Sequence, residues 1–132
     1  MSGSLHHIEL WVDDVAAAQS SWGWLLSALG WTENQTWPDG ASWRDGAMYL
    51  VVTRTPALSD DTHDRRRPGV NHLAFHAGAS HDVDALLSAA EENGWSALYA
   101  ERYPHAGGPD HYAAYLENAA GFKVELVGKS EA

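Results

Sequence analysis

The sequence predicts an α+β fold made of two similar halves, each with one strand, one helix and three further strands. Two stretches, Leu5–Val12 and Val70–Ala77, alternate polar and apolar residues as half-buried strands do. Each stretch has a histidine near its start, and each is followed by a segment with apolar residues at helical spacing. We therefore expect two βαβββ modules whose strands form a cupped mixed sheet, with the helices on its outer face.

The spacing of matching residues supports an internal duplication. His72 follows His7 by 65 residues, and Gly94-Trp95 follows Gly30-Trp31 by 64 residues. An offset that persists across a strand and a helix is typical of a repeated unit. The alternative is a chance similarity between two amphipathic units.

The first module, 5–55, is predicted to contain a helix between its first two strands. Asp13 or Asp14 can cap this helix, and Gly30 suits its C-terminal end. In the first strand, Ile8 and Leu10 would face the helix. The expected elements are a strand over 5–12, a helix over 15–29, and strands over 31–37, 41–44 and 47–55.

The second module, 70–128, follows a polar segment, 56–69, that has no periodicity and is predicted to connect the halves. Ser80 can cap the second helix. Each half is too small for a core of its own, so we expect residues 1–132 to form a single domain. The expected elements are a strand over 70–77, a helix from 80 to about 93, and strands over 95–100, 111–117 and 122–127.

Composition excludes several classes of function. The chain has 132 residues and a net charge of −10, which argues against nucleic acid as a partner. Cysteine is absent, which fits a reducing cytoplasm and excludes thiolate chemistry. No apolar run approaches the ~20 residues of a membrane span, and the first residues lack the pattern of a signal peptide. We expect a cytoplasmic protein that does not bind membranes.

Three polar side chains are predicted to leave the helix-packed side of the strands. In the last strand, Phe122 and Leu126 suit the helix side, so Glu125 faces the other way. The same alternation places His7 and His72 on that side. In a curled sheet these faces would form a cup, where two imidazoles and one carboxylate hold a divalent metal and leave positions open for substrate. Fe, Mn, Ni and Zn all suit this ligand set.

The sequence resembles the vicinal oxygen chelate superfamily, which includes glyoxalase I, extradiol dioxygenases, fosfomycin-resistance proteins and bleomycin-resistance proteins. The resemblance covers nearly the whole chain. It implies paired βαβββ modules around a metal, and it does not specify one reaction, because one fold hosts many chemistries. The stretches that carry it are His7–Val12, Asn71–Phe75 and Asn118–Leu126.

The resemblance also implies roles for individual residues. The metal positions of the family correspond to His7, His72 and Glu125. A fourth ligand, present in glyoxalase I, would fall near Leu50, which cannot bind a metal. Extradiol enzymes have a tyrosine ten residues before the metal glutamate, and Tyr115 occupies that place.

Other side chains are candidates for the cup. His76 shares the strand face of His72 and could act as an acid or base together with Tyr115. Each of these residues also has a structural alternative. His76 could be a simple hydrogen-bonded histidine, Arg102 a surface arginine, and Trp43 a residue that fills the core. The candidate substrate-binding residues are Trp11, Trp43, Leu50, Arg102, Tyr103 and His105.

These observations favour a divalent-metal-dependent enzyme of lyase, isomerase or dioxygenase type that acts on a small substrate with vicinal oxygens. The alternative is a protein of small-molecule binding or antibiotic resistance that sequesters its ligand without turnover. A third reading is a structural protein with a vestigial cup. We expect a homodimer, because an open sheet exposes strand edges, and the site can close within one chain or across the dimer.

Overall fold

The computed structural model describes residues 3–129. The chain divides into two compact units, Met1–Thr62 and His63–Ala132. The division falls within 56–69, the segment predicted to connect the two modules. We call these parts unit 1 and unit 2.

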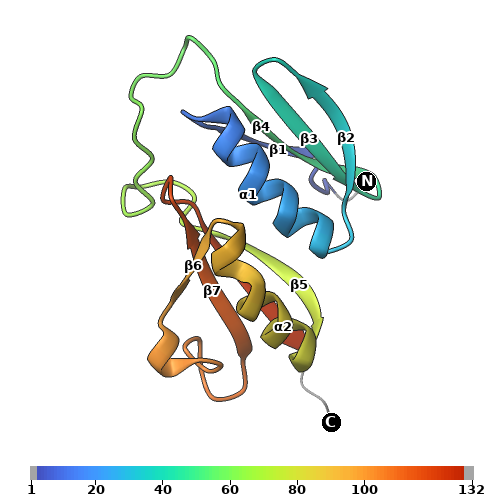
Figure 1. Ribbon diagram of the computed structural model, residues 1–132, viewed down its shortest axis with the longest axis vertical. Helices are drawn as coiled ribbons and strands as arrows, with labels where there is room; N and C mark the ends of the chain where they lie inside the picture. Colours follow the sequence, from blue (N-terminus) through green and yellow to red (C-terminus); the bar gives the residue numbers. More distant parts are fainter. Residues whose placement is uncertain (1–2, 130–132) are drawn as a thin grey trace. The chain divides into compact units, whose positions relative to one another are not determined.

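Unit 1 has one helix and a four-stranded mixed sheet (Figure 1). The strand order is β1-β4-β3-β2, in which β1 and β4 are parallel and the other neighbours are antiparallel. The elements are β1 (His7–Trp11), α1 (Val15–Ala28), β2 (Thr32–Trp37), β3 (Gly40–Asp45) and β4 (Met48–Thr53).

Unit 2 repeats this plan. Its strand order is β5-β8-β7-β6, and again the first and last strands are parallel neighbours. The elements are β5 (Leu73–Ala79), α2 (Ser80–Ala90), β6 (Trp95–Leu98), β7 (Tyr112–Asn118) and β8 (Lys123–Lys129), with short 3-10 turns η1 (Glu91–Asn93) and η2 (Ala100–Arg102). The two βαβββ modules of an α+β fold are therefore confirmed.

Each helix lies against one face of the sheet of its own unit. In α1, Trp22, Leu25 and Leu26 are at most 1% exposed and form the core of unit 1. Burial of each such side chain stabilises the fold by about 1.5–3 kcal/mol. Val83 of α2 and Trp95 of β6 are buried to the same extent in unit 2.

The helix starts follow local chemistry. Asp14 caps α1, because its carboxylate accepts a hydrogen bond of 3.0 Å from the amide of Ala17. The prediction that Ser80 caps α2 is wrong. The helix begins at Ser80 itself, whose hydroxyl donates to the carbonyl of Lys129, and the carboxylate of Asp82 accepts from the amide of Ala79 at 2.8 Å.

Two differences from the predicted strand bounds affect residues of the candidate site. Strand β5 begins at Leu73 instead of Val70, which is 68% exposed. Strand β6 ends at Leu98, because Tyr99 has a φ of 57°, in the left-handed region that interrupts a strand. Consequently His72 lies just before a strand, and Tyr99 lies just after one.

The other face of each sheet, opposite the helix, is called here the helix-free face. In β1 the alternation predicted from sequence is observed, because Ile8 and Leu10 are half-buried whereas His7, Glu9 and Trp11 are exposed. In unit 2 the helix-free face includes Tyr115 and Glu117 of β7 and Lys123, Glu125 and Val127 of β8.

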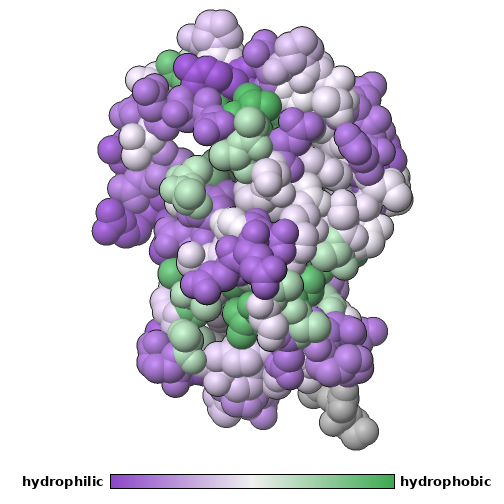
Figure 2. All heavy atoms as spheres, in the orientation of Figure 1, coloured by the Kyte–Doolittle hydropathy of each residue, from purple (hydrophilic) through white to green (hydrophobic). Residues whose placement is uncertain are grey.

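Hydrophilic residues predominate on the surface shown in Figure 2, as the net charge of −10 leads one to expect. Among the described residues, no helix is long and apolar enough to cross a membrane.

Candidate functional site on unit 2

A buried carboxylate marks the helix-free face of unit 2. Glu125 is 7% exposed and lies in the middle of β8. The strand register places it beside Ala74 of β5 on one side and beside Tyr115 of β7 on the other. A carboxylate is seldom buried without partners, so its neighbours determine what it can do.

Three polar side chains surround Glu125. His72 Nε2 lies 3.1 Å from Oε1, and His111 Nε2 contacts Oε2. The hydroxyl of Tyr115 also interacts with the carboxylate. Burial raises the pKa of Tyr115 above its ordinary value, and the charge of Glu125 and its hydrogen bond raise it further. Tyr115 is therefore a neutral donor at physiological pH.

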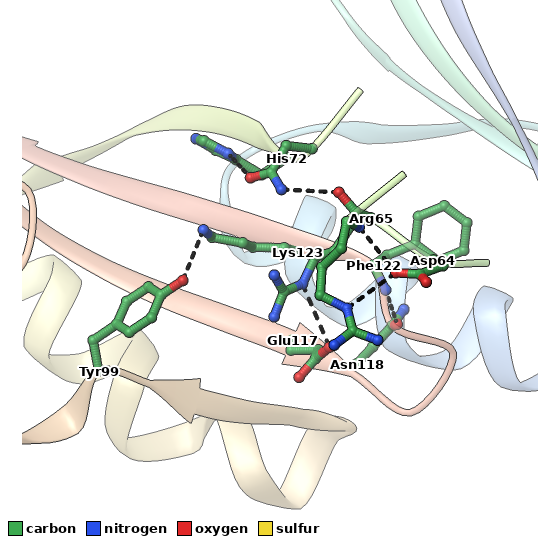
Figure 3. A network of polar contacts seen from close by, with 10 residues as sticks. Asp64, Arg65, His72, Tyr99, Glu117, Asn118, Phe122 and Lys123 are labelled. Atoms are coloured by element: carbon green, nitrogen blue, oxygen red, sulfur yellow. Dashed lines mark hydrogen bonds and ion pairs between the residues drawn. The ribbon is translucent and has the colours of Figure 1, made fainter. Parts of the chain in front are cut away.

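The orientation of the His72 ring follows from its neighbour. The side-chain amide nitrogen of Asn71 donates to the carbonyl of Arg65 at 3.0 Å, which leaves Asn71 Oδ1 to face His72 Nδ1 at 2.8 Å (Figure 3). Nδ1 must therefore carry a proton. In the neutral ring Nε2 then has a lone pair, directed at Glu125. Two acceptors 3.1 Å apart repel each other unless a proton or a cation lies between them.

His111 is a site residue that sequence reasoning missed, because it was assigned only to the start of a strand. It precedes β7, in a loop that returns toward Glu125. The ring of His105 supports this loop, because its Nδ1 contacts the carbonyl of His111 at 3.2 Å. The signal in the sequence was alternation, since His111 has the same parity as Ala113 and Tyr115.

The loop packs closely against the site at Gly107, where an added side chain would require its neighbours to shift. A Cβ atom at Gly107 would lie 2.6 Å from the hydroxyl of Tyr115 and 2.7 Å from Cδ2 of His111. Gly107 thus packs against two of the three side chains that surround Glu125.

His7, the third predicted ligand, belongs to unit 1. Its ring stacks on Tyr49 with centroids 4.8 Å apart, and its Nδ1 lies 2.9 Å from Nδ1 of His6. The indole of Trp11, on the same strand face, donates to Glu9 at 2.7 Å. Both predicted residues therefore lie on the helix-free face of unit 1.

Two candidate substrate-binding residues lie elsewhere, and this corrects the prediction. Trp43 is 3% exposed and packs on α1, where a Cβ at Gly23 would lie 3.3 Å from its ring. Leu50 is fully buried and pairs with Trp43 across the strands, so it also faces the helix. By register, the place in unit 1 that corresponds to Glu125 is Val51, which cannot bind a metal either.

Tyr103 also differs from expectation, because it points to the helix side. Its hydroxyl, like that of Tyr112, donates to Asp84 of α2. These two bonds, from Tyr103 first, lower the pKa of Asp84, whereas burial raises the pKa of Tyr103. Tyr103 is thus occupied in holding the η2 segment to α2.

The remaining candidates lie near the edge of the cluster. His76 is exposed on β5, two residues beyond Ala74, and thus shares the helix-free face. Arg102 is largely exposed, and its guanidinium lies 5.0 Å from the ring centroid of Tyr99. Within residues 3–129, no three histidine, aspartate or glutamate side chains form a group that could hold a metal ion.

Relatives of this chain are found among both sequences and structures. The uncharacterized protein YqjT of Bacillus subtilis is 44% identical over 128 residues, which cover 96% of this chain and 99% of that protein. A crystal structure of a candidate glyoxalase from Bacillus halodurans is 42% identical, covers 97% of each chain and has a TM-score of 0.91.

A more distant structure shares the fold. The fosfomycin resistance protein FosX of Listeria monocytogenes is 18% identical, with a TM-score of 0.67 over 98% of this chain and 94% of that chain. At this identity the likeness concerns the fold alone. Residues 6–115 match the family described as the Glyoxalase/Bleomycin resistance protein/Dioxygenase superfamily. The chain belongs to this superfamily.

Proposed function

We propose that the protein is a divalent-metal-dependent enzyme, of lyase, isomerase or dioxygenase type, that acts on a small substrate with vicinal oxygen atoms. The observation that carries this proposal is the pair His72 and Glu125. Asn71 holds His72 so that a ring nitrogen faces a buried carboxylate oxygen at 3.1 Å. Such a pair is completed either by a proton or by a cation.

The spacing of this pair suits a metal ion. Two ligand atoms that each lie about 2.0–2.2 Å from one ion are separated by about 3 Å in an octahedral site and by about 3.4 Å in a tetrahedral site. The 3.1 Å between His72 Nε2 and Glu125 Oε1 is compatible with this range. Asn71 would be the outer partner that sets the tautomer of a metal-bound histidine. We assign the third position to His7, following the ligand pattern of the superfamily.

The other side chains would support the chemistry. A bound ion would act as a Lewis acid on the substrate oxygens. His111 holds Oε2 of Glu125 and so leaves Oε1 for the ion. Tyr115, as a neutral donor, would hydrogen-bond a developing oxyanion, and His76 would exchange protons with a substrate on this face.

Metal binding tests the proposal most directly. Protein stripped with a chelator is titrated with Mn²⁺, Fe²⁺, Ni²⁺ or Zn²⁺, and the affinity is measured by calorimetry. We expect one ion per chain, and a loss of affinity of at least about 100-fold in His72→Ala, because one of few ligands is removed. His81→Ala is the matched control, since the His81 side chain is 76% exposed on α2.

The outcomes separate the candidate functions. Equal affinity in His72→Ala and the wild type contradicts the ligand assignment. No binding of any of the four ions contradicts metal dependence and favours a protein that sequesters small molecules. If an ion binds, a screen of compounds with adjacent hydroxyl and carbonyl groups then identifies the reaction.

A further inference from the structure

Lys123 is a cation on the same face as Glu125, two residues earlier in β8. Its side chain is partly buried, and the strand register places it opposite Glu117 of β7. Residues at i and i+2 of a strand lie about 6.5–7 Å apart on one face. Lys123 therefore lies within the length of a small molecule from the carboxylate of Glu125.

The partners of this ammonium group are uncharged. Nζ donates to the hydroxyl of Tyr99 at 3.0 Å (Figure 3), and it lies 5.1 Å and 5.3 Å from the ring centroids of Tyr99 and Tyr115. The two rings meet edge to face. Cation–π attraction stabilises the charge, but it does not saturate the N–H donors.

The nearest candidate for a counter-charge is engaged elsewhere. Glu117 forms an ion pair with Arg65, whose Nε lies 3.5 Å from Oε1 (Figure 3). Among residues 3–129, no carboxylate lies within ion-pair distance of Lys123. The ammonium group of Lys123 therefore keeps N–H donors from which an anionic ligand can accept hydrogen bonds.

Tyr115 connects this cation to the candidate metal ligands. Its ring lies against Lys123, its hydroxyl interacts with Glu125, and the ring of His72 lies 6.3 Å away, edge to face. Tyr99, the hydroxyl partner of Lys123, has a left-handed backbone with a φ of 57°, a conformation that non-glycine residues rarely adopt.

We propose that Lys123 and Tyr99 bind an anionic oxygen group of the substrate, a carboxylate, phosphonate or phosphate, a few bonds from the atoms held beside Glu125. The assignment to a substrate rests on the proposed function, whereas anion binding by these two residues does not require a metal. The ammonium supplies a charge-assisted hydrogen bond, and the phenol supplies a second donor.

The test uses the full chain in the presence of a chelator, so that a failure of metal binding does not affect it. Methylphosphonate, inorganic phosphate and acetate are titrated separately, and the backbone amide signals of 99 and 123 are followed by NMR. We expect saturable shifts in the wild type. Lys123→Met should weaken binding at least about tenfold, because one charge-assisted hydrogen bond is lost.

Two further variants complete the design. Lys129→Met is the matched control, because it removes the same charge from the same strand, and we expect unchanged affinity. Tyr99→Phe should weaken binding about threefold, through loss of a neutral hydrogen bond. If thermal unfolding shows that Lys123→Met is not folded, Tyr99→Phe serves as the test in its place.

Three results would overturn the proposal. The first is that none of the three anions gives a saturable shift in the wild type. The second is that anion affinity falls equally in Lys123→Met and Lys129→Met. The third applies when Tyr99→Phe replaces Lys123→Met as the test, and it is an unchanged anion affinity in Tyr99→Phe. Preference for methylphosphonate and phosphate over acetate would identify a tetrahedral anion, and the reverse preference would identify a carboxylate.

Discussion

Substitution of Gly107 by alanine tests whether the loop before β7 is packed against the site as the structure shows. The new Cβ would lie 2.6 Å from the hydroxyl of Tyr115 and 2.7 Å from Cδ2 of His111, where ordinary contacts begin at 3.4 Å. Neither side chain moves freely, because both contact the buried Glu125. We expect a loss of about 1–3 kcal/mol in the free energy of unfolding, the usual cost of overpacking.

The assay is urea unfolding of a double-mutant cycle. Tyr115→Phe removes the atom closest to the new Cβ, at the cost of about 1 kcal/mol for its hydrogen bond. If the clash is real, Gly107→Ala should cost at least about 0.5 kcal/mol less in the Tyr115→Phe background than in the wild type. Costs that add within about 0.3 kcal/mol, or a Gly107→Ala variant as stable as the wild type, would refute the packing described here.

Three other changes have defined outcomes. Trp43→Ala should cost about 3–5 kcal/mol of unfolding free energy, whereas Trp11→Ala, which is 45% exposed in the native protein, should cost less than about 1 kcal/mol; similar costs in urea unfolding would contradict the core assignment of Trp43. Because two tyrosine hydroxyls lower the pKa of Asp84, its contribution to stability is present above about pH 3.8 and is lost as the pH falls through the folded pKa. Asp84→Asn should therefore flatten the acid side of a plot of urea midpoint against pH, and an unchanged slope argues against these bonds. Asn71→Leu should lower metal affinity about 10–100-fold by calorimetry, because His72 loses the partner that sets its tautomer; undiminished affinity would remove Asn71 from the site.

Sequence reasoning named three residues that the structure places in one cluster on unit 2, namely Glu125, Tyr115 and His72. Alternation gave the side on which Glu125 points, because that side depends only on the position of a residue along its strand. Tyr115 came from the family resemblance, and His72 lies just before β5, where Asn71 orients its ring. The assignment of His7 to the same ion remains a prediction.

Alternation did not place a residue correctly where the sequence does not show which face of its strand meets the helix. Trp43 and Leu50 belong to strands, but their sequence alone does not say which face meets α1. The register between β3 and β4 decides that both point to the helix. An aromatic residue on a strand fits a core and a binding surface equally well, so the residue type could not settle the choice.

Loop residues were beyond sequence reasoning for a different reason. Tyr103 and His111 flank a loop without periodicity, and each is placed by a distant partner. Asp84 of α2 holds Tyr103 on the helix side, and Glu125 of β8 holds His111 on the other side. Loop conformation depends on such long-range contacts, which become available only when the whole unit has folded.

The amino-acid sequence by itself determined the two βαβββ modules and the side of the sheet on which Glu125 lies. These features follow from local rules of spacing, capping and alternation. Only the tertiary structure decided that His111 joins Glu125, that Trp43 belongs to the core, and that Lys123 turns toward Tyr99 instead of Glu117. Each of these outcomes is a choice among partners distant in sequence, and packing and charge in the folded unit make that choice.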